Sequence, residues 1–264
     1  MNPPASTSFS FEWLFLVLSA AAVVGYVRMA RTVERPSRGR AALFGLGVAL
    51  VVFSLNSPLE TIAVHYLLVI HLLQNVMIAD WAPPLLILGL TPAMRTAVSR
   101  RGGRPFELAT RPAVALPLWL AVWYGVHLPP FYDWALRTGW PLNLEHGLLI
   151  LAGLLFWWPV FSDAPQHVST AVRLAYLGIA FVGSAFLSLA YIFSARAFYA
   201  FYEHAPRLWG LSPIRDQNLA GILMNAEQTS IIFVAFAWAL YRVIAEEEAA
   251  QRRLDAAYLD AHPQ

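Results

Sequence analysis

The sequence predicts an all-α membrane protein, a bundle of seven transmembrane helices. Of its 264 residues, 58% are hydrophobic and only 13% are charged, and the mean hydropathy is +0.55. A soluble domain carries about a quarter charged residues and could not bury this much apolar surface. No segment alternates with a period of two, and lipid admits only helices or closed barrels. The composition excludes a soluble enzyme, a nucleic-acid-binding domain and a disordered chain.

Seven apolar segments account for the spans, since about 20 residues cross the apolar core of a bilayer. They are Phe11–Val27, Ala41–Leu55, Thr61–Leu90, Ala113–His127, Leu144–Phe161, Val172–Phe193 and Leu219–Val243. The first ten residues carry no charge, so we expect the first segment to be retained rather than cleaved as a signal peptide. Pro83 and Pro84 interrupt the third segment, and proline disrupts the preceding helical turn. We therefore expect that helix to end near residues 80–82, before a short apolar segment.

The arginines predict the orientation of the bundle. All 18 basic residues are arginine, and 14 of them fall on one side of the predicted spans. The four on the other side are Arg137, Arg196, Arg207 and Arg215. The positive-inside rule places the arginine-rich side in the cytoplasm, with the N-terminus outside and the C-terminus inside. Residues 1–245 then form one membrane domain, and residues 246–264 form a charged cytoplasmic tail.

Ionisable side chains inside a span are costly, so each is a candidate for function. His71, His127 and His146 are predicted at similar depth near the outer interface, on three different spans, and Met224 lies about two turns into the last span. The chain has no Cys, which excludes disulfides, zinc–thiolate sites and iron–sulfur clusters. Imidazole and thioether ligands without thiolate suit copper. One interpretation is therefore an outward-facing copper site made of these four residues.

A second set of polar residues flanks these ligands: Gln74, Asn75, Glu145, Asp216 and Gln217. His71, Gln74 and Asn75 share one helical face, whereas His65 points about 120° away from His71 and is expected at the interface. The same groups also suit interhelical hydrogen bonding, a normal role in membrane bundles. This alternative predicts a non-catalytic scaffold or accessory subunit with no cofactor.

Two further hypotheses remain open. A haem-binding bundle would use two of the histidines as axial ligands. A proton-coupled carrier would use Glu227, the ionisable residue near the middle of the last span, although no internal repeat of the kind found in transporters is visible. The Gly-x-Ser-x-Gly, P-loop and His-Glu-x-x-His motifs do not occur, so no catalytic residues and no enzyme are predicted.

Four motifs occur in order between about residues 60 and 230. They are His71-Leu-Leu-Gln74-Asn75 with Ala82-Pro83-Pro84-Leu85-Leu86, His127-Leu-Pro129-Pro130-Phe-Tyr132-Asp133, Leu144-Glu145-His146 with Phe156-Trp157-Trp158-Pro159, and Leu211-Ser212-Pro213 with Asp216-Gln217, Gly221 and Met224. Together they resemble the multi-spanning CtaG family, the assembly factors of caa3-type cytochrome c oxidase. The chain departs from the family pattern at Leu72, Asn75 and Asn225, where the family has Met, His and Trp.

The resemblance implies a multi-pass protein of the bacterial inner (plasma) membrane that helps to mature a haem-copper oxidase. Copper held at His71, His127, His146 and Met224 would pass to an oxidase subunit or a periplasmic copper chaperone. The flanking polar residues would orient the imidazoles. Membrane lipid is the other expected partner, and nucleic acid is not one.

Overall fold

The computed structural model describes residues 3–261, and every regular element in that range is a helix. Within it, six helical segments are long and apolar enough to cross a membrane. They are Trp13–Thr32 (α1), Arg38–Leu55 (α2), Leu68–Gly89 (α4, the π-helical turn η1 and α5), Gly139–Phe161 (α9), Thr170–Phe193 (α10) and Pro213–Leu254 of α12. Pro112–Val126 (α7) and Pro129–Arg137 (α8) are bent by 65° relative to each other, and they add a seventh candidate span if the pair is taken as one. The predicted all-α membrane bundle is confirmed, with up to seven spans.

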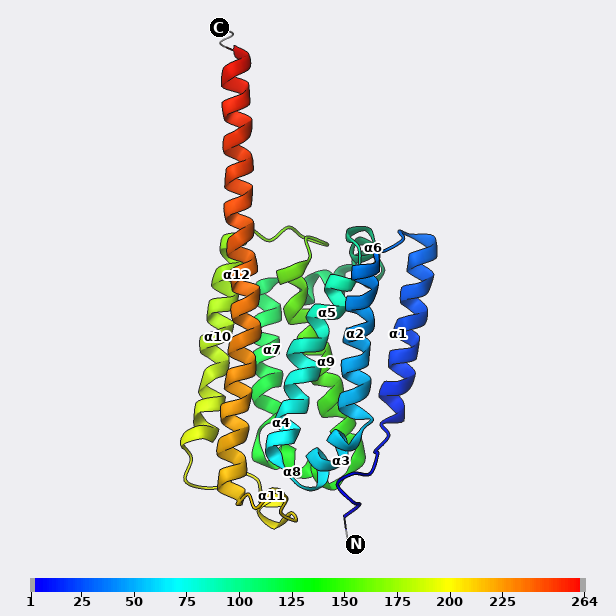
Figure 1. Cartoon of the computed structure of the whole chain (residues 1–264), viewed down its shortest axis with the longest axis vertical. Coiled ribbons are helices and arrows are strands. Elements are labelled where there is room, and N and C mark those ends of the chain that lie inside the picture. The colour runs from blue at the N-terminus through cyan, green and yellow to red at the C-terminus, as the bar shows by residue number, and fades with distance from the viewer. Residues whose placement is uncertain (1–2, 262–264) are drawn as a thin grey trace.

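Shorter helices lie at the two ends of the bundle (Figure 1). They are Pro58–His65 (α3), Pro92–Ala109 (α6) and Ala200–His204 (α11). We call the end with α3, α8 and α11 the outer end, following the predicted orientation, which stays a prediction. The inner end carries α6 and the α1–α2 connection, the two segments richest in arginine. The helix α12 (Pro213–Ala261) continues through the predicted tail, whose last three residues lie outside the described part.

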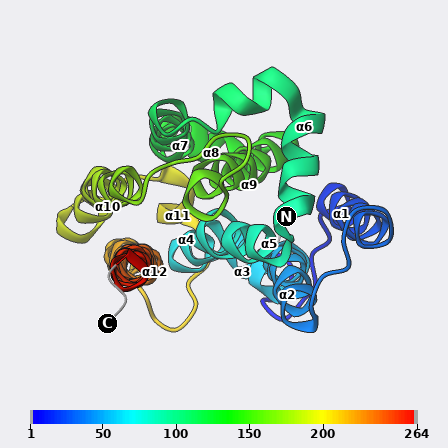
Figure 2. The same cartoon turned by 90° about the horizontal axis from the view of Figure 1, so that it is seen from above.

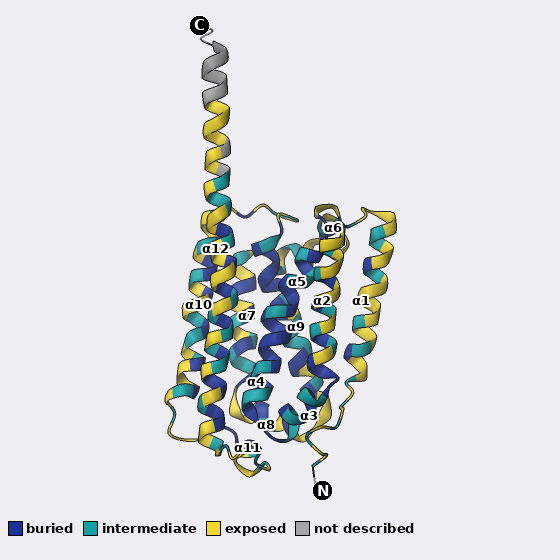
Figure 3. Ribbon diagram, viewed as in Figure 1, coloured by how far each residue is buried: buried dark blue, intermediate teal, exposed yellow. Residues whose placement is uncertain are grey.

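Burial is concentrated in the middle of the bundle. Figure 3 shows the most continuous buried surface on α4, α5 and α9, whereas α1 and most of α12 are exposed. Figure 2, seen from above, places α1 at the edge beside α2. Five of the predicted site residues lie on these central helices: His71, Gln74, Asn75, Glu145 and His146.

The third predicted span differs from its prediction. The chain breaks earlier, between α3 and α4 (Leu68–Val76), where Leu67 is extended and the Asp216 carboxylate accepts hydrogen bonds from the N–H groups of Leu68 and Val69, both at 2.9 Å. The expected helix end near residues 80–82 is wrong. Pro83 and Pro84 lie in the first turn of α5 (Ala82–Gly89), directly after η1 (Met77–Trp81). Wider π-helical turns interrupt the regular ladder, so the missing proline donors are tolerated there.

Two glycines let the central helices approach closely. A Cβ atom at Gly153 of α9 would overlap the carbonyl oxygen of Ala79 in η1. At Gly221 of α12, a Cβ atom would lie 2.7 Å from the Tyr191 Cβ atom of α10. Small residues at helix contacts are how membrane helices pack closely, because lipid provides no hydrophobic driving force between them. Gly153 therefore fixes η1 against α9, on the helix that carries His146.

Candidate functional site

The imidazole of His71 is held in one orientation. Its Nδ1 atom lies 2.9 Å from the Tyr202 hydroxyl of α11, and that hydroxyl donates to the Ala63 carbonyl at 2.5 Å. A hydroxyl has one hydrogen, so the Tyr202 oxygen accepts from His71, and Nδ1 carries the ring proton. The Nε2 atom of His71 is therefore unprotonated, and it is buried with no hydrogen-bond partner.

The imidazole of His127 has the same arrangement. It lies at the bend between α7 and α8, and its Nδ1 atom is 2.6 Å from the Trp123 carbonyl oxygen. A carbonyl only accepts, so Nδ1 carries the proton and Nε2 has a free lone pair. This Nε2 atom is also buried without a partner. Histidine ligands of metals typically donate the other ring N–H to a backbone or side-chain oxygen in this way.

His146 of α9 completes a cluster of three imidazoles. It is fully buried, and neither of its ring nitrogens has a hydrogen-bond partner. Its ring centroid lies 6.1 Å from that of His71. The Tyr132 ring of α8 is 4.9 Å from His71 and 5.8 Å from His127, centroid to centroid. The structure thus brings the three predicted histidines into one buried group, with His71 next to both His146 and Tyr132, and His127 on Tyr132.

Asn75 and Glu145 form one edge of this imidazole cluster. The Asn75 Nδ2 atom donates to Glu145 Oε1 at 2.9 Å, and the same oxygen lies 3.5 Å from His71 Nε2. Both residues are fully buried, and Glu145 Oε2 has no partner. Asn75 therefore holds a carboxyl group beside the free nitrogen of His71.

The other predicted flanking residues position the backbone. Gln74 donates to the Ser54 carbonyl at 2.8 Å and contacts the Glu60 carboxylate. Gln217 accepts from the Phe198 N–H at 2.7 Å and donates to the Arg196 carbonyl at 2.9 Å. These bonds, like the Asp216 cap of α4 described above, anchor the segments that carry His71 and Tyr202. None of the three residues hydrogen-bonds to an imidazole among the described contacts.

Met224 and Glu227 lie on α12. Met224 is fully buried in the same hydrophobic cluster as Tyr132. Glu227 is half-buried, and no hydrogen bond of its side chain occurs among the described residues. One turn away from Met224, Gln228 instead donates to the buried Asp80 carboxylate at 3.4 Å. Among the described residues, no hydrogen bond joins Glu227 to the imidazole cluster.

The donor set suits copper, but its geometry is not closed. Within the described range 3–261, no group of three or more His, Cys, Asp or Glu side chains is arranged to hold a metal ion. His71 neighbours His146, and the Tyr132 ring lies beside His71 and His127, but the free nitrogens of the three imidazoles do not meet at one point. Side-chain rotation would be required before three of them could bind one ion.

Sequence reasoning missed the tyrosines of this site. Besides Tyr132 and Tyr202, Tyr199 donates to the His127 carbonyl at 2.9 Å and contacts the Tyr191 hydroxyl. Tyrosines near the ends of spans usually belong to the interfacial aromatic belt. One sequence feature could have identified Tyr132 as a site residue, because it follows His127 by five residues within one of the four motifs.

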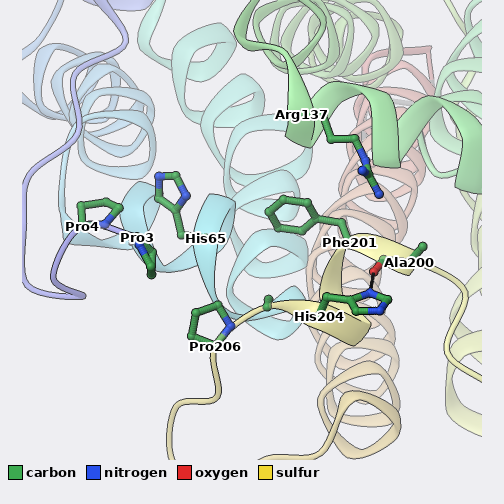
Figure 4. A pocket seen from close by; sticks show the side chains of 9 residues that line it. Pro3, Pro4, His65, Arg137, Ala200, Phe201, His204 and Pro206 are labelled. Carbon is green, nitrogen blue, oxygen red and sulfur yellow. Dashed lines mark hydrogen bonds between the residues drawn. The ribbon is translucent and has the colours of Figure 1, made fainter. Parts of the chain in front are cut away.

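A cavity of about 770 Å³ lies at the outer end of the bundle (Figure 4). Its lining includes His65 of α3, Arg137 of α8, and Phe201 and His204 of α11. His65 and His204 lie on opposite sides of it in Figure 4, and burial lowers the pKa of His65. Phe201 precedes Tyr202, the residue that holds His71. The cavity therefore lies beside α11, the helix whose Tyr202 hydroxyl orients His71.

Comparisons with known proteins agree with these observations. The profile of the cytochrome c oxidase caa3 assembly factor family (Caa3_CtaG) matches residues 21–246. An uncharacterized protein of Mycobacterium leprae is 25% identical over 294 residues, covering 98% of this chain and 44% of the relative. Uncharacterized proteins of Mycobacterium bovis and Mycobacterium tuberculosis are each 24% identical over 303 residues, again covering 98% of this chain and 44% of the relative.

The chain therefore spans less than half the length of these curated relatives. No solved structure matches it. The family profile, in contrast, covers most of the chain, including all four motifs and the imidazole cluster. The resemblance seen in the sequence is confirmed: the chain belongs to the cytochrome c oxidase caa3 assembly factor family.

Proposed function

We propose that this multi-pass protein assists the assembly of a haem-copper cytochrome c oxidase in the bacterial inner membrane by holding copper transiently. Family membership supports the assembly role. The copper step rests on one observation, the buried imidazoles of His71, His127 and His146, each with at least one ring nitrogen that has no hydrogen-bond partner. A buried polar atom without a partner costs about 1–3 kcal/mol, a cost that binding a metal would offset.

Each ligand has a defined role in this proposal. His71 and His127 present Nε2 to the ion because their Nδ1–H groups are already bonded. His146 supplies a third nitrogen, and Met224 supplies a thioether from α12. A site without thiolate, which forms only after side-chain rotation, suits delivery better than storage. Copper would leave it for an oxidase subunit or a periplasmic copper chaperone.

The proposal is tested by complementation of a strain that lacks this gene. We expect the wild-type protein to restore oxidase activity and the haem-copper content of the membranes, and the double variant His71→Ala/His146→Ala to restore neither. The control is His167→Ala, an exposed histidine of the α9–α10 connection. Full restoration by the double variant, at equal protein level, would contradict the copper step.

A second candidate is a scaffold that holds oxidase subunits without a metal. The absence of a closed ligand group among the described residues favours it, as does the anchoring of backbone segments by Gln74, Asp216 and Gln217. The scaffold predicts that the double variant lowers thermal stability and co-purification with the oxidase. It also predicts unchanged copper in any oxidase that does assemble.

A further inference from the structure

An apolar crevice separates α1 from the centre of the bundle. A cavity of about 310 Å³ lies along its outer half, where Phe15 of α1 faces Ile150 of α9. A cavity of about 400 Å³ lies along its inner half, between Tyr26 and Trp158. The residues common to both linings are Ala22, Leu86, Leu151 and Leu154. The two cavities therefore form one continuous space, which we call the α1 crevice.

The α1 crevice has the dimensions and polarity of a lipid chain site. Its α1 wall runs from Phe15 to Met29, which is about 21 Å of helix and most of the roughly 30 Å apolar thickness of a bilayer. The polar side chains in its lining are Ser19 and Tyr26, and the Tyr26 hydroxyl donates to the Gly89 carbonyl at 3.2 Å. The rest of the lining is almost entirely apolar, which suits an acyl chain.

Two guanidinium groups meet at the inner mouth of the crevice. Arg40 donates to the carbonyls of Leu88 at 2.8 Å and Leu90 at 2.7 Å, and Arg95 donates to the same Leu90 carbonyl at 3.3 Å. Leu90 lines the crevice. Burial, and then the charge of Arg40, lower the pKa of Arg95, with a smaller opposite effect of Asp163. Among the described residues, neither guanidinium has a carboxylate as a hydrogen-bond partner.

The surroundings of this mouth are strongly cationic. Residues 28–40 contain five arginines and one acid, Glu34, and residues 92–111 contain five arginines and one acid, Glu107. Glu107 is already paired with Arg111 at 3.0 Å. Figure 2 shows α6 beginning between α1 and α5, over the inner end of the bundle. Basic pockets between helices on the cytoplasmic side attract anionic head groups.

We propose that the α1 crevice binds an anionic phospholipid. One acyl chain lies between α1 and α9, and the phosphate lies against the guanidinium groups of Arg40 and Arg95. The apolar walls supply affinity for any chain, and the cationic mouth supplies the preference for a negatively charged head group. The outer end of the crevice borders the imidazole cluster, because Phe15 packs edge-on against His146, but the proposed head-group site lies at the inner end and does not depend on copper.

The test uses full-length protein exchanged into detergent with phosphatidylglycerol or phosphatidylcholine, and bound lipid is counted by mass spectrometry of the intact complex. Gly25 and Gly147 line the crevice, and a Cβ atom at either meets nothing within 4 Å. Gly25→Leu and Gly147→Leu therefore add an apolar side chain in the crevice lining, with open space at the Cβ atom. The matched control is Gly45→Leu, equally open but outside the crevice lining.

We expect wild-type protein to retain phosphatidylglycerol in preference to phosphatidylcholine. The two crevice variants should bind it about tenfold more weakly, while Gly45→Leu binds it normally. Arg40→Gln and Arg95→Gln should each lower the affinity for phosphatidylglycerol about fivefold and leave the affinity for phosphatidylcholine unchanged. Arg137→Gln, at the outer end, should change the affinity for neither lipid.

Equal retention of the two lipids by wild-type protein would overturn the proposal. Unchanged phosphatidylglycerol binding in both crevice variants would overturn it as well. If the arginine variants lose helical circular dichroism, the crevice variants and their glycine control still decide the outcome, because they leave the Leu90 carbonyl contacts in place.

Discussion

His71 and His127 show how single hydrogen bonds prepare a side chain for binding. In each, the Nδ1–H group donates a hydrogen bond to an oxygen whose position is fixed, so the Nε2 atom keeps a free lone pair inside the buried site. For His71, the acceptor is a tyrosine hydroxyl whose own proton is committed to Ala63. The chemistry of the imidazole cluster therefore depends on Tyr202, which lies 131 residues from His71 in the chain.

Removing the Tyr202 hydroxyl tests this dependence. Tyr202→Phe leaves the His71 Nδ1–H without its acceptor, so we expect a loss of about 1 kcal/mol in the free energy of unfolding. We also expect copper affinity to fall about tenfold, as for other changes to the partner of a ligating histidine. Thermal unfolding and copper titration measure the two effects. Tyr241→Phe, at a side chain that is 70% exposed, is the control, and equal copper affinity in the two variants would contradict the role of Tyr202.

Glu60 makes stability depend on pH. It is buried at the outer end, and burial raises its pKa from 4.5 to about 8, with the charges of Glu12 and Glu145 adding to the increase and the hydrogen bond from Gln74 opposing it. The folded protein therefore holds this proton more tightly than the unfolded chain. Its stabilising effect is complete below pH 4.5 and is lost progressively as the pH rises toward about 8.

Glu60→Gln should remove this part of the pH dependence. We expect the wild-type unfolding temperature in detergent to fall between pH 5 and pH 9 more steeply than that of the variant. Each unit of pKa difference corresponds to about 1.4 kcal/mol. Parallel curves for the two proteins would show that the Glu60 carboxyl does not change its protonation on folding.

At the scale of elements, hydropathy located the spans, but it could not locate their irregularities. The helix break at Leu67 is stabilised by Asp216, which lies 148 residues away from Leu68 in the sequence. No local sequence pattern therefore predicts this break. The continuation past Pro83 depends on η1 and on the close approach of Gly153 to Ala79. Local proline rules predict a helix end here, and the tertiary contact with α9 overrides them.

The contact between α9 and η1 predicts the effect of a single methyl group. Gly153→Ala places a Cβ atom against the Ala79 carbonyl, and we expect it to destabilise the protein by about 1–3 kcal/mol. Gly147→Ala, on the same helix with open space around it, should be neutral or stabilising by up to about 1 kcal/mol. Chemical unfolding of the two variants in the same detergent measures the difference. Equal stabilities would mean that η1 is not held against α9 at this point.

At the scale of the whole molecule, the sequence predicted the bundle and the shared depth of His71, His127 and His146, because span order and the aligned ends of the helices determine depth. It could not predict that the Tyr132 ring lies beside His71 and His127, or that Asn75 pairs with Glu145. Those contacts depend on how the helices are rotated and packed together. Hydropathy does not contain that information.

The orientation of the bundle is tested by labelling single cysteines, which the cysteine-free sequence makes simple. Glu34→Cys lies in the α1–α2 connection and Ala195→Cys in the α10–α11 connection, and both positions are exposed. A membrane-impermeant thiol reagent should label Ala195→Cys in intact cells, and Glu34→Cys only after permeabilisation. The opposite pattern would invert the assigned outer and inner ends.

The copper step itself is tested most directly by titrating the purified full-length protein with Cu(I) against a competing chelator. We predict binding at low micromolar metal by wild-type protein and by His167→Ala, and about tenfold or more weaker binding by His71→Ala/His146→Ala. Identical titrations of the wild-type protein and the double variant would contradict the assignment of the imidazole cluster as a copper site.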